Sequence, residues 1–585
     1  MFLRSKERTK DGKTHRYWSL VETVRTESGP RQRTLCCLGE LNDPAQQRWR
    51  KTIEVFNAQG ESQQLCLFPW EDSGAVEEGG QVAHVVLGGV RMERSRQFGN
   101  CFIGLELWKR LKLDRFFEEL LDKSRADVAW SRIAAVLAIN RLCDPGSELA
   151  IQQRWYPATA LDDLLDIPDG KVDDSRLYRC LDRLLPHKTK LERHLRQRYG
   201  ELFSAEFDVL LYDLTSTYVE GQAEANPMMK RGYSRDHRSD CKQVVVALIV
   251  NTEGFPLSYE TFDGNRRDVT TLEAVLRMVE RKHGKARRVW VFDRGIISEE
   301  NLAALRRRGG QYLCGTLRSQ LNKFEKQLLD GHWTTVQGDV EVQPIPIPSG
   351  EETYILCRSD ARKTKETAMR LRFSSSMEDA LTKLQKRIAS GQLKDRLKME
   401  RALGSIQARH PSVKDLYRFA IVEREGKHHL DWNLMEERRK WRDAREGAYL
   451  LRTNLKDEKP EDLWKKYTQL TEAEAAFRAL KSELSIRPIF HQVERRVKAH
   501  ILVAFLGYAL WVTLKHLLKA AHSNLSPANA LALLSTLNSA DIVLPTTDGR
   551  QIRLRRITSP DAQQTLLLHQ LGVHLPERLR SDFQM

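Results

Sequence analysis

The spacing of apolar residues changes twice along the chain and predicts three kinds of segment. Up to about residue 95 the pattern is short and mixed, and it predicts two strands, Tyr17–Thr26 and Arg33–Leu41. From Cys101 apolar residues recur at helical spacing, which predicts a series of helices, one of them capped by Asp174. From Phe207 short apolar runs alternate with amphipathic stretches, which is typical of an α/β sheet.

The α/β segment is predicted to run strand, strand, strand, helix, strand, helix, strand. The run that ends at Asp293 is almost continuously apolar and is therefore expected to be buried on both faces of a sheet. A tight turn is expected at residues 251–254, and Ser298 is the expected cap of the second helix. The predicted strands are 207–213, 242–251, 255–262, 288–293 and 311–316, and the helices are 270–284 and 298–309.

Beyond residue 316 the pattern is mixed before it becomes mostly helical. Residues 340–347, 352–358 and 416–423 favour strands, and 376–388 favours a charged helix. A buried strand is expected at 447–454, a helix at 471–484, and a basic hairpin with an Asp548-Gly549 turn near the end. The stretch His500–Leu518 is apolar enough for a membrane span, but it carries Lys515 and His516, which favours a buried core helix.

These patterns predict six regions, with glycines and acidic residues at 71–80 as a linker. The α/β core is expected to be interrupted and then resumed. The regions are an N-terminal β-rich region (1–95), a helical DNA-binding domain (96–204), the first part of an α/β core (205–316), a β-rich and helical insertion (317–445), the second part of the core (446–520) and a C-terminal helical region (521–585).

Composition and absent motifs limit the partners and the kinds of chemistry that fit the chain. Its 585 residues include 95 Lys and Arg and 79 Asp and Glu, which gives a formal charge of +16. This positive charge favours a polyanionic partner such as nucleic acid, although a soluble protein with a basic surface has the same composition. The nine cysteines form no C-x-x-C pair, so neither a disulfide framework nor a cysteine zinc site is expected, and a reducing cytosol fits best. Motifs for nucleotide binding, dinucleotide binding, zinc proteolysis and serine hydrolysis are absent from the sequence.

Two aspartates that end predicted strands are the strongest candidates for chemistry. Asp213 ends FDVLLYD and Asp293 ends RVWVFD. A carboxylate at the end of a buried strand is held at the rim of the sheet, where α/β sites form. Two such carboxylates can hold Mg2+, although a single strand-ending Asp more often only closes a loop.

A third acid is expected on the helix at 471–484. On a helical wheel Glu474 lies at the edge of the apolar stripe and shares a face with Lys481, with Arg478 between them. Glu472 is expected to point away from that stripe, toward solvent. Spacing alone also fits an ordinary pair of surface charges.

Several segments together resemble insertion-sequence transposases of the DDE class, and more narrowly the "insertion-sequence four" superfamily. They are YDLTSTYVEG, RGYSRDHRSDCKQ, FDGNRRD, VFDRG, YLLRTN and AAFRALKSELSIRPIFH, between residues 208 and 500. The resemblance implies a ribonuclease-H-like core interrupted by an insertion, with Asp213, Asp293 and Glu474 as ligands of two Mg2+ ions, for which Mn2+ can substitute. The helix signature of the family is matched by Tyr467, Glu474 and Lys481, whereas its Arg position holds Leu470.

The resemblance also implies a function and its partners. It predicts cleavage at the ends of a mobile element and transfer of the freed strand into target DNA, without a nucleotide cofactor. A homodimer on terminal inverted repeats, a nucleoid-associated cytoplasmic protein and no membrane partner are expected. A transposase-derived DNA-binding protein without activity, and a nuclease that cuts without joining, are the alternatives. The expected DNA contacts are Tyr467, Arg478, Lys481, Arg294, Lys230 and Arg231; Asp268 is expected to cap a helix and His491 to be structural.

Overall fold

The structure is a computed structural model that describes most of the chain as two compact units. It describes residues 2–10, 13–26, 29–40, 54–56, 62–64, 84–123, 126–285, 287–346 and 351–576. The first unit comprises Met1–Val86 with Thr546–Arg550, and the second comprises the rest. The linker predicted at 71–80 lies outside the described residues.

The first unit is built from antiparallel strands. Strands β1 (Phe2–Lys10), β2 (Lys13–Thr26) and β3 (Gly29–Glu40) form one sheet, and β4 (Glu54–Phe56) pairs with β5 (Ser62–Gln64). The two predicted strands correspond to β2 and β3. Strand β1 was not predicted because its sequence, FLRSKERTK, is too charged to show an alternation of apolar and polar residues.

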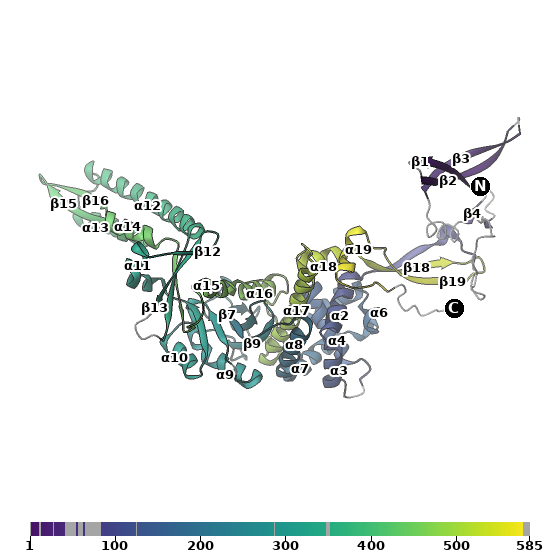
Figure 1. Ribbon diagram of the computed structural model, residues 1–585, viewed down its shortest axis with the longest axis horizontal. Helices are drawn as coiled ribbons and strands as arrows, with labels where there is room; N and C mark the ends of the chain where they lie inside the picture. Colours follow the sequence, from purple (N-terminus) through teal and green to yellow (C-terminus); the bar gives the residue numbers. More distant parts are fainter. Residues whose placement is uncertain are drawn as a thin grey trace. The chain divides into compact units, whose positions relative to one another are not determined.

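The helical part of the second unit packs around one long buried helix, α17 (Glu494–Ala520) (Figure 1). This helix is long and apolar enough to cross a membrane, but 83% of its most apolar window is buried inside the protein, as expected for a core helix. The helical spacing over residues 103–121 is divided between two helices, because Lys112 adopts a left-handed conformation with φ of 52°. The other longer helices here are α2 (Gly99–Arg110), α3 (Leu113–Leu121), α4 (Trp130–Cys143), α7 (Asp174–Leu184), α8 (Lys188–Phe203), α18 (Pro527–Ser535) and α19 (Ala562–Gln570).

Two local expectations in this part are corrected by the structure. Asp173, not Asp174, caps α7, because its carboxylate accepts from the backbone N–H of Arg176. The predicted C-terminal hairpin exists as β18 (Asn538–Pro545) and β19 (Gln551–Ile557), but it also pairs with β6 (Arg91–Gln97) to form a three-stranded sheet.

A nine-stranded mixed sheet forms the α/β part of the second unit. Its order is β12-β13-β14-β17-β11-β10-β7-β8-β9. Strand β8 pairs antiparallel with both β7 and β9, and β7, β10 and β11 are parallel, which is the order of a ribonuclease-H-like core, as predicted. The bounds are β7 (Val209–Tyr218), β8 (Gln243–Asn251), β9 (Pro256–Asp263), β10 (Val289–Phe292), β11 (Gln311–Gly315), β12 (Thr334–Gln337), β13 (Val340–Pro346), β14 (Thr353–Ser359) and β17 (Ala448–Thr453).

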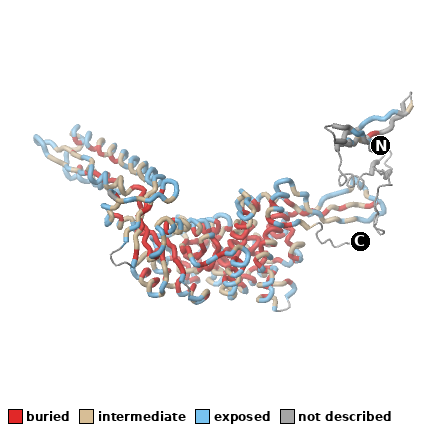
Figure 2. The backbone as a smooth tube through the Cα atoms, in the orientation of Figure 1, coloured by how far each residue is buried: buried red, intermediate tan, exposed pale blue. Residues whose placement is uncertain are grey.

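Helices flank this sheet and complete its core. Figure 2 shows the buried residues concentrated in the sheet and in the helices beside it. Ser298 caps α10 as predicted, with its hydroxyl accepting from the N–H of Asn301. The helices are α9 (Leu272–His283), α10 (Glu299–Arg307), α11 (Glu325–Asp330), α15 (Pro460–Thr468) and α16 (Leu470–Ser482).

The segment predicted as an insertion contributes to the sheet and also folds separately. Strands β12, β13 and β14 lie in this segment, yet they extend the main sheet because β14 pairs with β17. The part that follows has its own small core, which includes Met377, Leu381 and Tyr417. It comprises α12 (Asp360–Ala389), α13 (Arg396–Arg409), β15 (Tyr417–Arg424), β16 (Lys427–Leu434) and α14 (Glu436–Arg445), of which α12 is longer than the predicted helix and β16 was not predicted.

Candidate active site

Asp213 and Asp293 lie side by side at the edge of the sheet where β10 ends. In the parallel pairing of β7 and β10, Phe292 is opposite Tyr212, so the next residues, Asp293 and Asp213, are level with each other. Neighbouring strands are about 4.8 Å apart and both side chains point to the same face. Asp293 is exposed, whereas Asp213 is half-buried and accepts a hydrogen bond of 2.8 Å from the N–H of Leu214.

Glu474 joins the two aspartates from the helix α16, which packs on β7. Burial raises the pKa of Asp213 to about 6, and the negative charges of Glu474 and Asp293 add to this effect, against the N–H of Leu214 and the guanidinium of Arg235. The three acids are therefore within electrostatic reach of one another. We call this place, defined by Asp213, Asp293 and Glu474, the carboxyl edge.

Tyr467 reaches the carboxyl edge from a different helix than expected. The chain breaks between α15 and α16 at Gln469, so Tyr467 does not share a helix face with Glu474 and Lys481. Its hydroxyl nevertheless lies 3.4 Å from Oδ1 of Asp293, to which it donates. Burial and the charge of Asp293 raise the pKa of Tyr467, which keeps the hydroxyl protonated as a donor.

Gly315, which ends β11, is a site residue that the sequence did not reveal. A Cβ atom there would lie 2.4 Å from the hydroxyl oxygen of Tyr467 and 3.5 Å from Oδ1 of Asp293. Any side chain would therefore displace the tyrosine. The only signal in the sequence is a glycine at the end of a buried strand, where close approach of another group is one of several common reasons.

The two glutamates at the start of α16 have different surroundings. Glu474 is exposed at the carboxyl edge. Glu472 points away from it, as predicted, but not into solvent: it is half-buried and accepts a hydrogen bond of 2.6 Å from Nζ of Lys515 on α17. The expectation of a solvated Glu472 was wrong because α17 covers that side of the helix.

Lys481 takes part in a buried ion pair that was not expected. Its Nζ donates to Oδ1 of Asp236 at 2.8 Å, and Arg487 also contacts this oxygen. The side chain of Asp236 is only 4% exposed, and that of Lys481 13%. These contacts fasten the segment after β7 to the helix that carries Glu474, while the role of Lys481 in DNA binding stays a prediction.

Asp268 has an ion-pair partner instead of a capping role. Its Oδ2 accepts from Arg235 at 2.5 Å, and α9 begins at Leu272 without a side-chain cap. The expectation that Asp268 caps this helix was wrong. A Cβ atom on Gly295 would lie 3.5 Å from the same oxygen, so this pair lies next to the loop that follows Asp293.

The remaining residues predicted to contact DNA are all exposed. Arg478, Arg294 and Arg231 are exposed side chains, and Lys230 pairs with Asp263 at 2.6 Å. His491 is buried beside Glu148, with 3.3 Å between Nε2 and Oε1, in agreement with a structural role.

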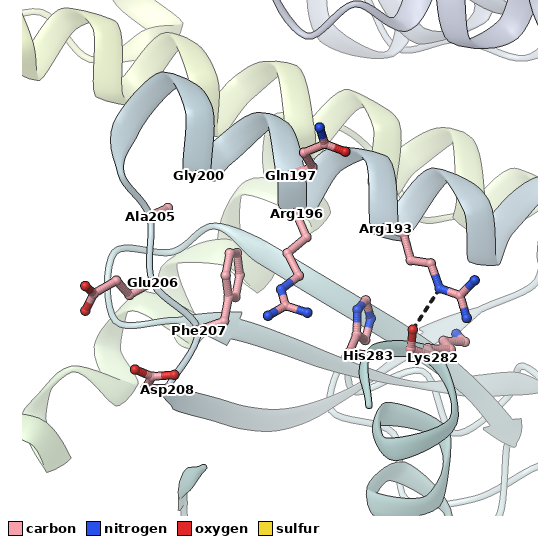
Figure 3. A pocket seen from close by; sticks show the side chains of 10 residues that line it. All are labelled: Arg193, Arg196, Gln197, Gly200, Ala205, Glu206, Phe207, Asp208, Lys282 and His283. Carbon is pink, nitrogen blue, oxygen red and sulfur yellow. Dashed lines mark hydrogen bonds between the residues drawn. The ribbon is translucent and has the colours of Figure 1, made fainter. Parts of the chain in front are cut away.

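A cavity of about 580 Å³ lies away from these residues, near the start of β7 (Figure 3). Arg193, Arg196 and His283 line it together with Glu206 and Asp208. None of the three acids of the carboxyl edge lines this cavity.

Comparisons with known proteins agree with this arrangement. Residues 205–510, more than half of the chain, match the family described as "Transposase DDE domain", and the chain belongs to this family of DNA transposases. Residues 3–64 match the "IS1634 family transposase, N-terminal domain". A comparison with curated proteins found no match.

One similar solved structure is the piggyBac transposase synaptic complex with hairpin DNA. The sequence identity is 8% and the TM-score 0.35, over 74% of this chain and 79% of the other. This similarity is too low to add to the assignment.

Proposed function

We propose that the chain cleaves DNA at the ends of its mobile element and joins the freed ends to target DNA, with Asp213, Asp293 and Glu474 as ligands of Mg2+. The observation that supports the proposal is the lack of charge compensation at the carboxyl edge. Among the residues that the structure describes, these three acids form no ion pair, and their mutual repulsion contributes to the raised pKa of Asp213.

The donor set fits hard divalent cations. Mg2+ prefers oxygen ligands, keeps several waters and is commonly held by one or two carboxylates. Within the described part of the chain no three acidic, His or Cys side chains lie close enough to surround one ion. A two-ion site does not require this, because each ion can be held by a pair of the acids, with Asp213 between Asp293 and Glu474.

Bound cations would supply activation of the attacking oxygen and neutralisation of the leaving oxygen of a phosphodiester. The protein groups would orient the ligands and the DNA. Tyr467 would hold the carboxylate of Asp293 through its hydroxyl, 3.4 Å away. Arg294 and Arg478, both exposed, would contact phosphates beside the acids.

The substrate proposed is double-stranded DNA with terminal inverted repeats, bound by a homodimer. The positive charge of the chain supports a polyanionic partner. Neither cleavage nor joining would need a nucleotide, since the attacking groups are water and then the 3′-hydroxyl of the cut strand.

Cleavage and strand-transfer assays on DNA that carries the element's ends test the proposal. The protein with Mg2+ should cut at the end of the repeat and join the cut end to a plasmid, and EDTA should stop both steps. Asp213→Asn and Asp293→Asn should lose both activities but keep end binding. Cutting without joining would instead indicate a nuclease, and binding without either activity would indicate an inactive DNA-binding protein.

A further inference from the structure

The segment between β7 and β8 carries the most exposed large hydrophobic side chain among the residues that the structure describes. Tyr233 is 84% exposed. The segment begins where β7 ends, at Tyr218, which lies beyond the level of Asp213 and Asp293. It then returns toward the two aspartates, because the N–H of Arg235 donates to the hydroxyl of Ser216 at 3.2 Å. Tyrosine is enriched at binding interfaces, because it combines an apolar ring with a polar hydroxyl.

The backbone around Tyr233 is held in place on both sides. The carbonyl of Tyr233 accepts from Nε2 of Gln243 at 3.0 Å, and Lys230 exchanges backbone hydrogen bonds with Gln243. Gly232 is packed so tightly that a Cβ atom would lie 2.3 Å from the carbonyl oxygen of Gly264. The ring is therefore exposed because the fixed backbone projects it, and not because the segment lacks contacts.

Two ion pairs then connect the segment to the carboxyl edge. Arg235 donates to Asp268 at 2.5 Å, and its charge acts on the pKa of Asp213. The next residue, Asp236, is held by Lys481 of the helix that carries Glu474. Arg235, two residues after Tyr233, is therefore close enough to Asp213 for their charges to interact. Asp236, three residues after Tyr233, is bound to the helix that carries Glu474.

The charges around Tyr233 fit a nucleic acid. Lys230 and Arg231 precede it and are exposed, which suits backbone phosphates. Aromatic side chains stack on bases of any sequence, provided that the base is unpaired. A base next to a phosphate undergoing cleavage is a suitable partner if the duplex is opened there.

We propose that Tyr233 stacks on an unpaired base beside the phosphodiester that is cut, and so positions the DNA at the carboxyl edge. This inference rests on the proposed cleavage reaction. It assigns to Tyr233 a contact with substrate and no part in the chemistry, which distinguishes it from the acids.

Photocrosslinking tests the contact without requiring cleavage. The probe is a duplex of the terminal repeat with 5-iodouracil placed singly at positions around the cut, bound to full-length Asp213→Asn protein. Irradiation should give a crosslink to the peptide that contains Tyr233 at one or two adjacent positions. The crosslink should persist in a Tyr233→Phe background and disappear in Tyr233→Leu, which keeps the bulk but lacks the ring; crosslinks to other peptides only would overturn the proposal.

A substrate with an abasic site tests the energetic role. Loss of one base-stacking contact should lower kcat/KM of cleavage by about 5- to 150-fold in Tyr233→Leu on intact DNA. On DNA that lacks the stacked base the wild type and Tyr233→Leu should cleave at equal rates, whereas a merely structural role would keep the difference. Phe373→Leu, at another exposed aromatic in α12, is the matched control and should cleave like the wild type on both substrates.

The two proposals fail in different ways. If Asp213→Asn still cleaves, the assignment of the acids is wrong whatever Tyr233 does. If the acids are required but Tyr233→Leu cleaves intact DNA at the wild-type rate, the stacking contact is wrong and the proposed function stands.

Discussion

The carboxylates of Glu192 and Asp213 are both withdrawn from solvent, but the charges around them differ. Glu192 on α8 is completely buried, but Nζ of Lys282 lies 2.8 Å and Nζ of Lys188 3.0 Å from its oxygens. Burial would raise the pKa of Glu192, yet the two lysines outweigh burial and hold that pKa below its usual range. Asp213 is less buried but has only a backbone N–H and a more distant Arg235, and its pKa rises to about 6.

The difference separates a structural acid from an acid of the proposed metal site. Where the chain supplies its own cations, as around Glu192, the carboxylate is charge-balanced and needs nothing from solution. At the carboxyl edge the chain supplies fewer cations, and the proposed Mg2+ would balance the charge of the three acids. The amount of local cationic charge, and not burial alone, indicates which acids belong to the site.

The largest effect is expected from the two glutamates of α16. Glu474→Gln should reduce Mg2+-dependent cleavage by about 1000-fold or more, since a metal contribution of several kcal/mol is lost. Glu472→Gln, the matched control, should keep most of the activity because its partner is Lys515. Cleavage rates of the two variants decide this, and the opposite ranking would show that the helix register at the site is wrong.

The stability of two other variants directly tests the comparison between Glu192 and Asp213. Glu192→Gln should lower the free energy of unfolding by about 3–5 kcal/mol, because it leaves two lysines buried without a counter-charge. Asp213→Asn should leave it unchanged or raise it at pH 7, because a pKa raised above the unfolded value means that the folded state disfavours the charge. Urea unfolding without divalent cations measures the free energy of unfolding of both variants. Equal losses of stability would show that the two carboxylates do not differ in charge compensation.

The close contact at Gly315 predicts a smaller loss of activity. Gly315→Ala should displace Tyr467 and lower the cleavage rate by about 10- to 100-fold, because the tyrosine supports a metal ligand. The substitution Gly404→Ala on α13, where a Cβ atom meets nothing within 4 Å, is the control. Activity like the wild type in Gly315→Ala would separate Tyr467 from the site.

His283 at the cavity predicts a dependence of stability on pH. Burial lowers the pKa of His283 to about 4, so the folded state binds fewer protons than the unfolded state between about pH 6.5 and pH 4. Stability should therefore fall as the pH drops through this range, and His283→Phe should reduce the slope by at most about 1.4 kcal/mol per pH unit. Unfolding curves at several pH values test this, and an unchanged slope would contradict it.

The smallest effect concerns the salt dependence of DNA binding. Arg231→Ala, in the segment between β7 and β8, should reduce the slope of log affinity against log salt by about 0.9, the value for one phosphate contact. Arg196→Ala at the cavity should not change it, because that residue lies at the other end of β7. Titrations with terminal-repeat DNA at several salt concentrations compare the two variants. Equal changes would mean that DNA contacts are not concentrated at the carboxyl edge.

The sequence by itself determined the five core strands, since short apolar runs mark β7, β8, β9, β10 and β11. It placed Asp213 at the end of a strand, which was wrong because β7 continues to Tyr218, and the catalytic role of the two aspartates stays a prediction. The apolar run interrupted by Lys515 and His516 predicted the core helix α17. Periodicity predicted the direction of Glu474 relative to Glu472, because it depends on local spacing along one helix. The motifs were close enough to known transposases to predict the family that the comparison then confirmed.

Only the tertiary structure decided which charged side chains form ion pairs. Glu472 with Lys515, Asp236 with Lys481 and Glu192 with Lys282 are each far apart in sequence, so no local pattern could pair them. The spacing also did not predict the break at Gln469, because Tyr467, Glu474 and Lys481 stand at seven-residue intervals that fit one continuous helix. Spacing along the chain specifies faces of single elements, whereas the compensation of a buried charge depends on elements that the fold brings together.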